Sequence, residues 1–467
     1  MARAELWASV ASVCIAAALA GCSDDPETTN DGGGGGGPSD AVAFHRDIEP
    51  LLQQHCLSCH TEGRIGGFSL LTYEEASAQS GVIAANVESR LMPPFLAQNT
   101  DDCQVRFGFA DDPRLTDDEI ALFRAWDDAG APEGDPKDAP PPYVISDPGL
   151  PNADIAIDAP VTTSVEGTED IFKCVVYDPK LTADTWIDGI HFVPGNPKID
   201  HHALLGRLDR ADLPVGALEA GAYDCFGSPG DMIHGWVPGA VPLELPEGAA
   251  ISLGANDVIV VQMHYHPIGA VETDRSTVEL RKASGTPTYE FRTLLWGNAR
   301  NAAQGLASGP DDSSSTPEFL IPAGVTDHTE TMSLTLPGVL GIDLKILTVA
   351  SHMHYVGVDE RIQVTRAQPT ADQPAEECLL ETPHWDFNWQ RGYLYDAAFE
   401  SLPTVTGGDT ITVQCTYDND MGNPGVQKAL SEQGLSMPID IPLGESTLEE
   451  MCIAGFGVLV PVGTPGF

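Results

Sequence analysis

The sequence predicts a multidomain protein in which a small all-α domain is followed by two antiparallel β-sandwich, jelly-roll-like domains. Three observations predict this fold class. The 467 residues exceed one small domain, and 42% of them are hydrophobic, which is enough for real cores. Apolar residues recur at helical spacing near the N-terminus. Beyond that segment the chain changes to short alternating runs punctuated by Gly and Pro, which is typical of antiparallel sandwiches rather than βαβ units.

The charge balance is strongly acidic. The chain has 23 Lys and Arg against 69 Asp and Glu, a net charge of −46 at pH 7. A surface this negative repels phosphate backbones and anionic lipid, so nucleic-acid binding is excluded. We interpret the charge as a means of solubility in a salty or extracellular setting, and a basic partner is the alternative.

Residues 1–21 have the features of an export signal. Arg3 precedes an apolar stretch that ends in small residues and is too short to span a bilayer comfortably. The run "LAGC" resembles a bacterial lipobox, which implies lipidation of Cys22; the alternative is an ordinary secretory signal with an incidental cysteine. Residues 22–40 then form a flexible tether with six consecutive glycines. We therefore predict an exported, lipid-anchored protein of the bacterial cell envelope, in the periplasm or at the outer membrane or cell surface, that meets a membrane only through this anchor.

Residues 41–135 carry the motif "CLSCH". C-x-x-C-H is the attachment signature of c-type haem, in which two thiols, here Cys56 and Cys59, bind the vinyl groups and the adjacent His60 ligates iron. A helical pattern precedes the motif, and a second one with Thr116 as N-cap follows it. The segment resembles a small cytochrome c, so we expect one covalently attached haem c and a role in electron transfer.

The sixth iron ligand is expected on the loop between these two helices. The run "SRLMPPF" supplies Met92 there, where prolines stiffen the loop and a thioether raises the haem potential. The alternative is that Met92 only fills the core and that His45 or His55 ligates iron instead.

A proline-rich linker, residues 136–153, leads to the predicted sandwiches over residues 154–284 and 285–462. Three tight sets of histidines lie in these sandwiches. Residues i and i+2 of a strand point to one face, so the two histidines of "HYH" (264–266) project together, as do those of "HMH" (352–354). The adjacent pair (201–202) needs a twist or a bulge before both rings reach one ion. Such sets predict metal binding, although imidazole alone suits zinc, copper or iron.

The order of these motifs resembles the ascorbate-dependent type II copper monooxygenases, a family that includes peptidylglycine α-hydroxylating monooxygenase and dopamine β-monooxygenase. The run from "DHHALL" through "DMIHGWVPGAVPLELPEGAAISLG" to "VIVVQMHYH" is similar to the first sandwich of this family. The stretches "VASHMHYVG", "CTYDNDMGNPG" and "STLEEMCIAGF" are similar to the second. The likeness covers residues 154–462, and "LEEMC" is particularly close to the dopamine branch.

The resemblance implies two copper ions. The first would be held by three imidazoles, those of His201, His202 and His264, and would store and relay an electron. The second would be held by two imidazoles and a thioether, those of His352, His354 and Met451. In the family this second copper binds oxygen and abstracts hydrogen from a C–H bond. A soft thioether favours the cuprous state that must meet O2, and a site with three ligands leaves a position open.

Two alternatives for these ligands stay open. Met421 in "NDMGNPG" competes with Met451 for the thioether role, and His266 replaces or supplements His264. The remaining histidines of the two sandwiches lack a motif, and we interpret them as structural or surface residues: His191, His234, His328 and His384.

The resemblance also implies two disulfides, Cys174–Cys225 and Cys415–Cys452. The second would lock the strand that carries Met451. The sequence leaves open whether Cys103 and Cys378 pair and staple the front segment to a sandwich or stay free; we favour free thiols.

Departures from the family pattern bear on the substrate. The peptide-amidating branch has an arginine two residues before its H-x-H pair, which binds a substrate carboxylate, and this chain has Ala350 there. Ile453 and Gly455 stand where that branch has polar anchors after the ligand methionine. A peptidylglycine substrate is therefore not expected, and nothing else in the sequence indicates a phenethylamine.

We predict a copper-dependent monooxygenase that uses O2 to hydroxylate a C–H bond of a small organic substrate. Ascorbate or another redox donor, the fused haem c, or both would supply the electrons. The alternative is a non-catalytic haem and copper electron-transfer lipoprotein, which has no need of an open site at Met451. A zinc hydrolase is a remote third interpretation, because no carboxylate is positioned beside the histidine sets as a general base.

Overall fold

The computed structural model describes residues 41–145, 149–225, 227–298, 305–309, 312, 317–338 and 341–464. The predicted signal peptide, residues 1–21, and the tether with its lipidated Cys22, residues 22–40, lie outside the described residues. From Val42 onward the described residues form one compact unit. None of the described helices is both long enough and apolar enough to cross a membrane.

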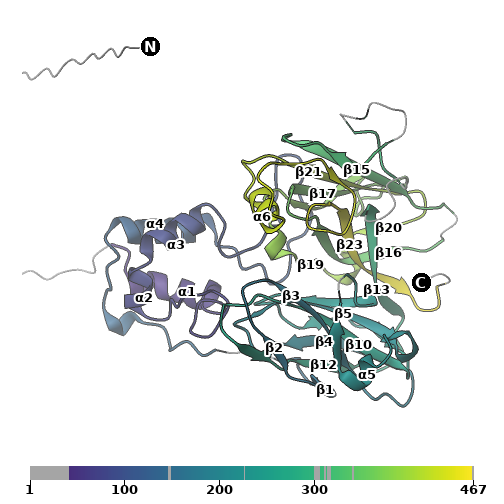
Figure 1. Ribbon diagram of the computed structural model, residues 1–467, viewed down its shortest axis with the longest axis horizontal. Helices are drawn as coiled ribbons and strands as arrows, with labels where there is room; N and C mark the ends of the chain where they lie inside the picture. Colours follow the sequence, from purple (N-terminus) through teal and green to yellow (C-terminus); the bar gives the residue numbers. More distant parts are fainter. Residues whose placement is uncertain are drawn as a thin grey trace, which may run out of the picture. The chain divides into compact units, whose positions relative to one another are not determined.

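This unit is mostly β-sheet (Figure 1). Its α-helices are α1 (Glu49–His55), α2 (Tyr73–Ser77), α3 (Ser80–Glu88), α4 (Asp117–Asp128), α5 (Ala217–Ala220) and α6 (Pro424–Glu432). A π-helical turn and four 3-10 turns accompany them: η1 (Phe44–Ile48), η2 (Pro136–Asp138), η3 (Arg210–Asp212), η4 (Phe387–Trp389) and η5 (Phe399–Ser401). Helix α4 begins with the predicted capping box, in which the Thr116 hydroxyl and the Glu119 carboxylate each accept from the other's backbone N–H.

The strands of the first half are β1 (Ile155–Asp158), β2 (Thr163–Val165), β3 (Ile171–Tyr177), β4 (Thr185–Val193), β5 (Asp200–Asp209), β6 (Ala222–Asp224), β7 (Asp231–Trp236), β8 (Leu243–Glu244), β9 (Ala249–Leu253), β10 (Asp257–Tyr265), β11 (Glu272–Asp274) and β12 (Thr277–Lys282). Those of the second half are β13 (Tyr289–Asn298), β14 (Leu320–Ile321), β15 (His328–Thr335), β16 (Leu344–His352), β17 (Gly357–Thr365), β18 (Glu376–Thr382), β19 (Gly392–Leu394), β20 (Thr404–Val405), β21 (Thr410–Tyr417), β22 (Ile441–Pro442) and β23 (Cys452–Pro461).

One ten-stranded sheet runs through both halves of the strand-rich region. Its order is β1-β12-β4-β9-β13-β23-β16-β19, with β8 added to β4 and β20 to β16. A five-stranded sheet, β6-β3-β10-β5-β7, packs on its first half, and a four-stranded sheet, β15-β21-β17-β18, packs on its second half. The described ladders are antiparallel except for the pair β9 and β13, which joins the two halves.

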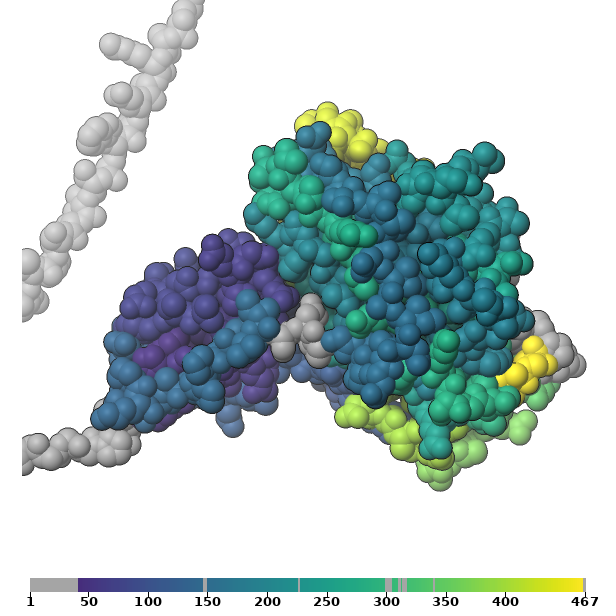
Figure 2. Space-filling view, turned by 90° about the horizontal axis from the view of Figure 1, so that it is seen from below, coloured from purple at the N-terminus to yellow at the C-terminus, as the bar shows by residue number. Residues whose placement is uncertain are grey.

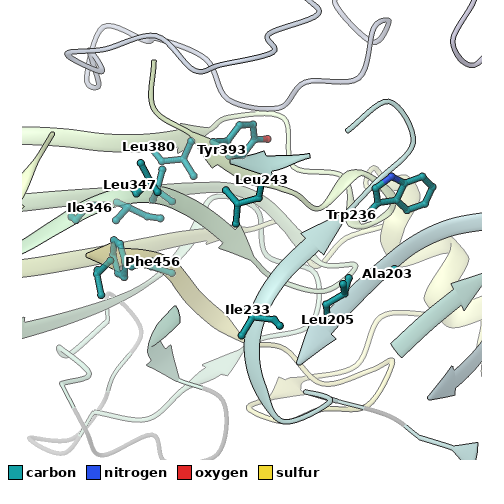
Figure 3. Packing of buried hydrophobic residues seen from close by; sticks show 14 of the residues in the cluster. Ala203, Leu205, Ile233, Trp236, Leu243, Ile346, Leu347, Leu380, Tyr393 and Phe456 are labelled. Carbon is teal, nitrogen blue, oxygen red and sulfur yellow. The ribbon is translucent and has the colours of Figure 1, made fainter. Parts of the chain in front are cut away.

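The strand-rich region has a continuous apolar core. Residues of β5 and β7, such as Leu205 and Ile233, belong to the same buried cluster as Ile346 of β16 and Phe456 of β23 (Figure 3). Strand β23 is buried almost throughout: it pairs on both edges, with β13 and with β16, and β21 of the four-stranded sheet packs against it. Strand β21, in contrast, alternates between buried and half-buried residues, as a strand with one face on the core should.

The predicted fold class is wrong in its first part, because no separate all-α cytochrome c domain is present over residues 41–135. Four short α-helices lie in this segment, and they share a small apolar cluster that includes Phe44 and Trp126. In Figure 2 they are purple and lie at the side of the teal, strand-rich residues. They belong, however, to the same compact unit as the sheets. One sheet also runs through both predicted sandwiches.

The physical reason lies in the stretch between α3 and α4. Its apolar residues Phe95, Ala97 and Phe109 are buried in the core of the strand-rich region and not among the helices. Phe95 packs edge-on against Tyr393, with ring centroids 5.1 Å apart. Helical spacing on either side of this stretch reveals two helices but not the partner on which the intervening residues pack.

Three disulfides tie the described residues together. Cys174–Cys225 and Cys415–Cys452 are the pairs that the resemblance implied. The third pair, Cys103–Cys378, corrects our expectation of free thiols, because it fastens the stretch between α3 and α4 to β18. An isolated bridge between Val105 and Cys378 lies beside it.

Candidate metal centres

The first centre lies on the paired strands β5 and β10. His202 stands opposite His264 in this ladder, and the next pair is Asp200 with Tyr265. His201 is therefore an extra residue on β5, so the register shifts at this point as in a β-bulge. This is the irregularity that an adjacent histidine pair needs in order to turn both rings toward one place.

The three imidazole rings of this centre approach one another through their Nδ1 atoms. His202 Nδ1 lies 3.3 Å from His201 Nδ1 and 3.3 Å from His264 Nδ1. The candidate ligand atoms of the three residues all lie within 4.8 Å of one another. Each ring nitrogen carries one proton or one lone pair in the ring plane, so His202 Nδ1 can satisfy only one neighbour. A single cation would satisfy all three lone pairs, and the residues therefore fit a metal ion.

Burial keeps these imidazoles in the form that binds metals. His201 is 9% exposed and His264 is 2% exposed. Burial, reinforced by the neighbouring His264, lowers the pKa of His201 to about 3. The same two causes lower the pKa of His202 well below its usual value. Both rings are thus neutral at pH 7, and a neutral imidazole has a lone pair for a metal.

Neighbouring residues hold the third imidazole. The His264 ring stacks on Phe172, with centroids 4.3 Å apart and an interplanar angle of 13°. Asp170 lies 3.4 Å from His264 Nε2, and its other oxygen accepts from His266 Nδ1 at 2.8 Å. His266 is more than half exposed and turned to this carboxylate, so the structure leaves it outside the set of three nitrogens. Among the candidates of the sequence, His264 is the one that joins the pair on β5.

The second centre lies at the end of β16. His352 is the last residue of this strand, and His354 follows after Met353, which is completely buried. The two rings are perpendicular, with centroids 5.4 Å apart. His352 Nδ1 donates to Gln390 Oε1 at 2.6 Å, and His354 Nδ1 donates to the Glu449 carbonyl at 2.8 Å. Because both Nδ1 atoms have these partners, the two Nε2 atoms carry the lone pairs, as in rings that bind a metal.

Met451 is brought to this end of β16 by β23. In that ladder His352 stands opposite Ile453, two residues after Met451. Met451 is 8% exposed, and its carbonyl accepts from the Tyr417 hydroxyl at 2.8 Å. The next residue, Cys452, is disulfide-bonded to β21. Met421, the rival for the thioether role, is 49% exposed in the turn before α6.

One segment missed by the sequence reasoning touches both centres, and it runs from Trp385 to Gln390. The Trp385 indole N–H donates to the carbonyl of His354 at 3.0 Å. Phe387, at the start of η4, stands perpendicular to the His354 ring, with centroids 6.0 Å apart. These contacts place two aromatic side chains against the second centre.

The same segment continues to the first centre. The Trp389 ring lies 6.2 Å from the His201 ring, and the adjacent Gln390 holds His352. In the sequence this segment is the aromatic run "HWDFNWQ", whose spacing is not that of metal ligands and therefore does not indicate a metal site.

The predicted haem ligands lie around the end of α1. Cys56 and Cys59 are free, half-buried thiols. His60 Nδ1 donates to the Phe68 carbonyl at 3.4 Å, which leaves its Nε2 for a metal. Gly66 lies so close that a Cβ there would come within 2.6 Å of His60 Nδ1. Two unpaired thiols beside an oriented imidazole fit the attachment of a haem.

The sixth haem ligand stays a prediction. Met92 follows α3, is half-buried, and its backbone N–H donates to the Asn86 carbonyl at 3.3 Å. The alternatives have other partners: His45 Nδ1 donates to Glu49 at 2.7 Å, and His55 Nδ1 donates to the Pro113 carbonyl at 2.8 Å. None of these contacts brings a side chain opposite His60.

The four histidines without a motif lie apart from these sets. His191 and His328 are buried, His234 is half-buried on β7, and His384 is exposed. His328 has Glu330 as a partner at 3.2 Å.

Comparison with known proteins does not assign the chain to a family. No family model and no curated protein matches the chain. Solved structures that resemble it include naturally occurring empty particles of cowpea mosaic virus (9% identity, 67% of this chain and 91% of that chain, TM-score 0.25). Others are the T13 particle of infectious bursal disease virus (10% identity, 67% and 78%, TM-score 0.14) and the VP2 subviral particle of that virus (9% identity, 66% and 80%, TM-score 0.13). TM-scores this low do not establish that the chain shares a fold with these proteins.

Proposed function

We propose that the chain is a copper-dependent monooxygenase of the ascorbate-dependent type II kind, which hydroxylates a C–H bond of a small organic substrate with O2. The observation that carries the proposal is the pair of unlike histidine sets. In the first set the Nδ1 atoms of His201, His202 and His264 lie close together. In the second set the Nε2 atoms of His352 and His354 are left free to bind a metal, at the end of β16 near which Met451 lies. Unlike ligand sets suit unlike roles for the same metal.

Copper would supply one-electron transfer at both centres and, at a centre with an open position, the activation of O2. The residues of the chain divide these tasks. His201, His202 and His264 form a set of nitrogen ligands, with Phe172 and Asp170 holding the third ring. Such a fixed set suits the storage and relay of an electron.

The second centre has the residues for substrate oxidation. His352, His354 and Met451 are two imidazoles and a soft thioether, a set that favours the cuprous state. Phe387 gives this centre an apolar neighbour, which would limit the access of water to the reaction. Ala350 in place of an arginine argues against a substrate that must bring a carboxylate.

A fused haem is part of the proposal. Cys56, Cys59 and His60 would hold a covalently attached haem c, with Met92 as the expected sixth ligand, and ascorbate or another carrier would be the external donor. The three disulfides favour an oxidising compartment, which agrees with an exported, lipid-anchored protein.

The test is copper and haem content, followed by turnover. We expect two copper ions and one haem per chain, and O2 consumption by the reduced protein when it is screened with small organic substrates. Met451→Ala should abolish substrate-dependent O2 consumption, whereas Met421→Ala, the matched control on the exposed turn, should not. Full turnover by Met451→Ala would refute the assigned oxygen site. Bound copper and haem without O2 consumption on any substrate would favour an electron-transfer lipoprotein instead.

A further inference from the structure

Glu450 is a buried carboxylate that precedes Met451 and so far has no role. Its side chain is 0% exposed. Its backbone is fixed on both sides, because its N–H donates to the Pro442 carbonyl at 3.0 Å and its carbonyl accepts from the Gly444 N–H at 3.0 Å. The side chain reaches the turn that follows β16, where its carboxylate has its hydrogen-bond partners.

The two carboxylate oxygens accept three backbone N–H groups there. Oε2 accepts from His354 at 2.7 Å and from Met451 at 3.2 Å, and Oε1 accepts from Val356 at 2.7 Å. The neighbouring Glu449 carbonyl accepts from the His354 ring. Two successive residues thus fix both the backbone and the ring of His354.

This arrangement supplies hydrogen-bond acceptors that the fold needs at this point. Strand β16 ends at His352, so the following N–H groups leave the sheet ladder while they are still buried. Buried N–H groups need acceptors, and a carboxylate is the strongest one a side chain offers. Among the described residues no ion pair includes Glu450, so its polar partners there are backbone N–H groups.

We propose that Glu450 is a positioning residue that holds His354 and Met451 in one frame, so that imidazole and thioether converge on the same metal. The inference rests on the proposed function, since it assigns a role within the second centre. Glu360 provides a smaller counterpart, because its Oε2 accepts from the backbone N–H of His352 at 2.9 Å and so holds the backbone of the other histidine ligand.

The experiment uses the full chain in a His201→Ala background, in which bound copper reports the second centre alone. Cuprous ion is titrated anaerobically against a competing chelator, and copper–sulfur scattering is read by X-ray absorption. Glu450→Gln offers one acceptor oxygen and turns an NH2 group toward N–H donors. We expect copper affinity to fall by about 10- to 100-fold, with loss of the sulfur signal.

Asp409→Asn is the matched control. Asp409 is 2% exposed, and its two carboxylate oxygens accept from the backbone N–H groups of Ala367 and Thr406, each at 2.9 Å. It precedes Thr410 at the start of β21, at the opposite end of this strand from Tyr417. This variant should keep the parent affinity and the sulfur signal. If Glu450→Gln does not fold, Glu450→Asp, which keeps the charge but is one methylene shorter, decides by the same two readouts.

Unchanged affinity and sulfur scattering in the folded Glu450 variant would overturn the positioning role and leave the proposed function intact. A parent chain that binds no copper at the second centre would overturn both.

Discussion

At the scale of single residues, the first centre depends on small differences in where neighbouring rings face. His264 and His266 are two residues apart, and the sequence alone makes them equal candidates. The strand β10 ends at Tyr265, so His266 has already left the ladder and turns to Asp170. His264 stays in the ladder opposite His202. The choice between them is therefore made by where a strand ends.

This difference gives a direct prediction. His264→Ala should remove one of the two copper ions per chain, because it deletes one of the three converging nitrogens. His266→Ala should keep both, since Asp170 still lies beside His264. Metal analysis of the purified variants measures this. Loss of copper from His266→Ala and retention in His264→Ala would show that the ligands are assigned the wrong way round.

At the scale of elements, the stretch between α3 and α4 behaves as part of the strand-rich region. Beside its disulfide, the Gln98 N–H donates to the Glu381 carbonyl at 3.0 Å, and Arg106 pairs with Glu377 at 2.6 Å. Glu377 is buried and is also paired with Arg366, so these contacts form a network and not isolated surface pairs. The stretch is thus fastened to β18 and the residues around it.

Removing the covalent part of this attachment should be measurable. Cys103→Ser with Cys378→Ser should lower the free energy of unfolding by about 2–4 kcal/mol, because the disulfide restricts the unfolded chain across a long loop. Urea unfolding of the double variant and the parent measures the difference. The two copper centres should keep their metal, since neither cysteine contacts them. An unchanged unfolding midpoint would mean that the noncovalent network suffices.

At the scale of the whole molecule, the proposed haem ligands and both proposed copper centres belong to one compact unit. If the haem delivers electrons to copper, the two cofactors should communicate without a second protein. We expect reduced haem to be reoxidised by O2 more slowly after copper is removed with a chelator, and the parent rate to return when copper is restored. Stopped-flow absorbance of the haem bands follows this. Equal rates with and without copper would show that the haem serves another acceptor.

The sequence by itself indicated which residues are able to bind metal and that they lie on or next to strands, because ligand chemistry and strand periodicity are local properties. It also required the irregularity at His201, since two adjacent side chains of a regular strand diverge. Only the tertiary structure decided that the helices share one unit with the sheets, that Cys103 pairs with Cys378, and that Trp389, Gln390 and Glu450 surround the ligands. Each of these depends on contacts between residues far apart in the chain, and such contacts are set by packing and buried hydrogen bonds that no local pattern records.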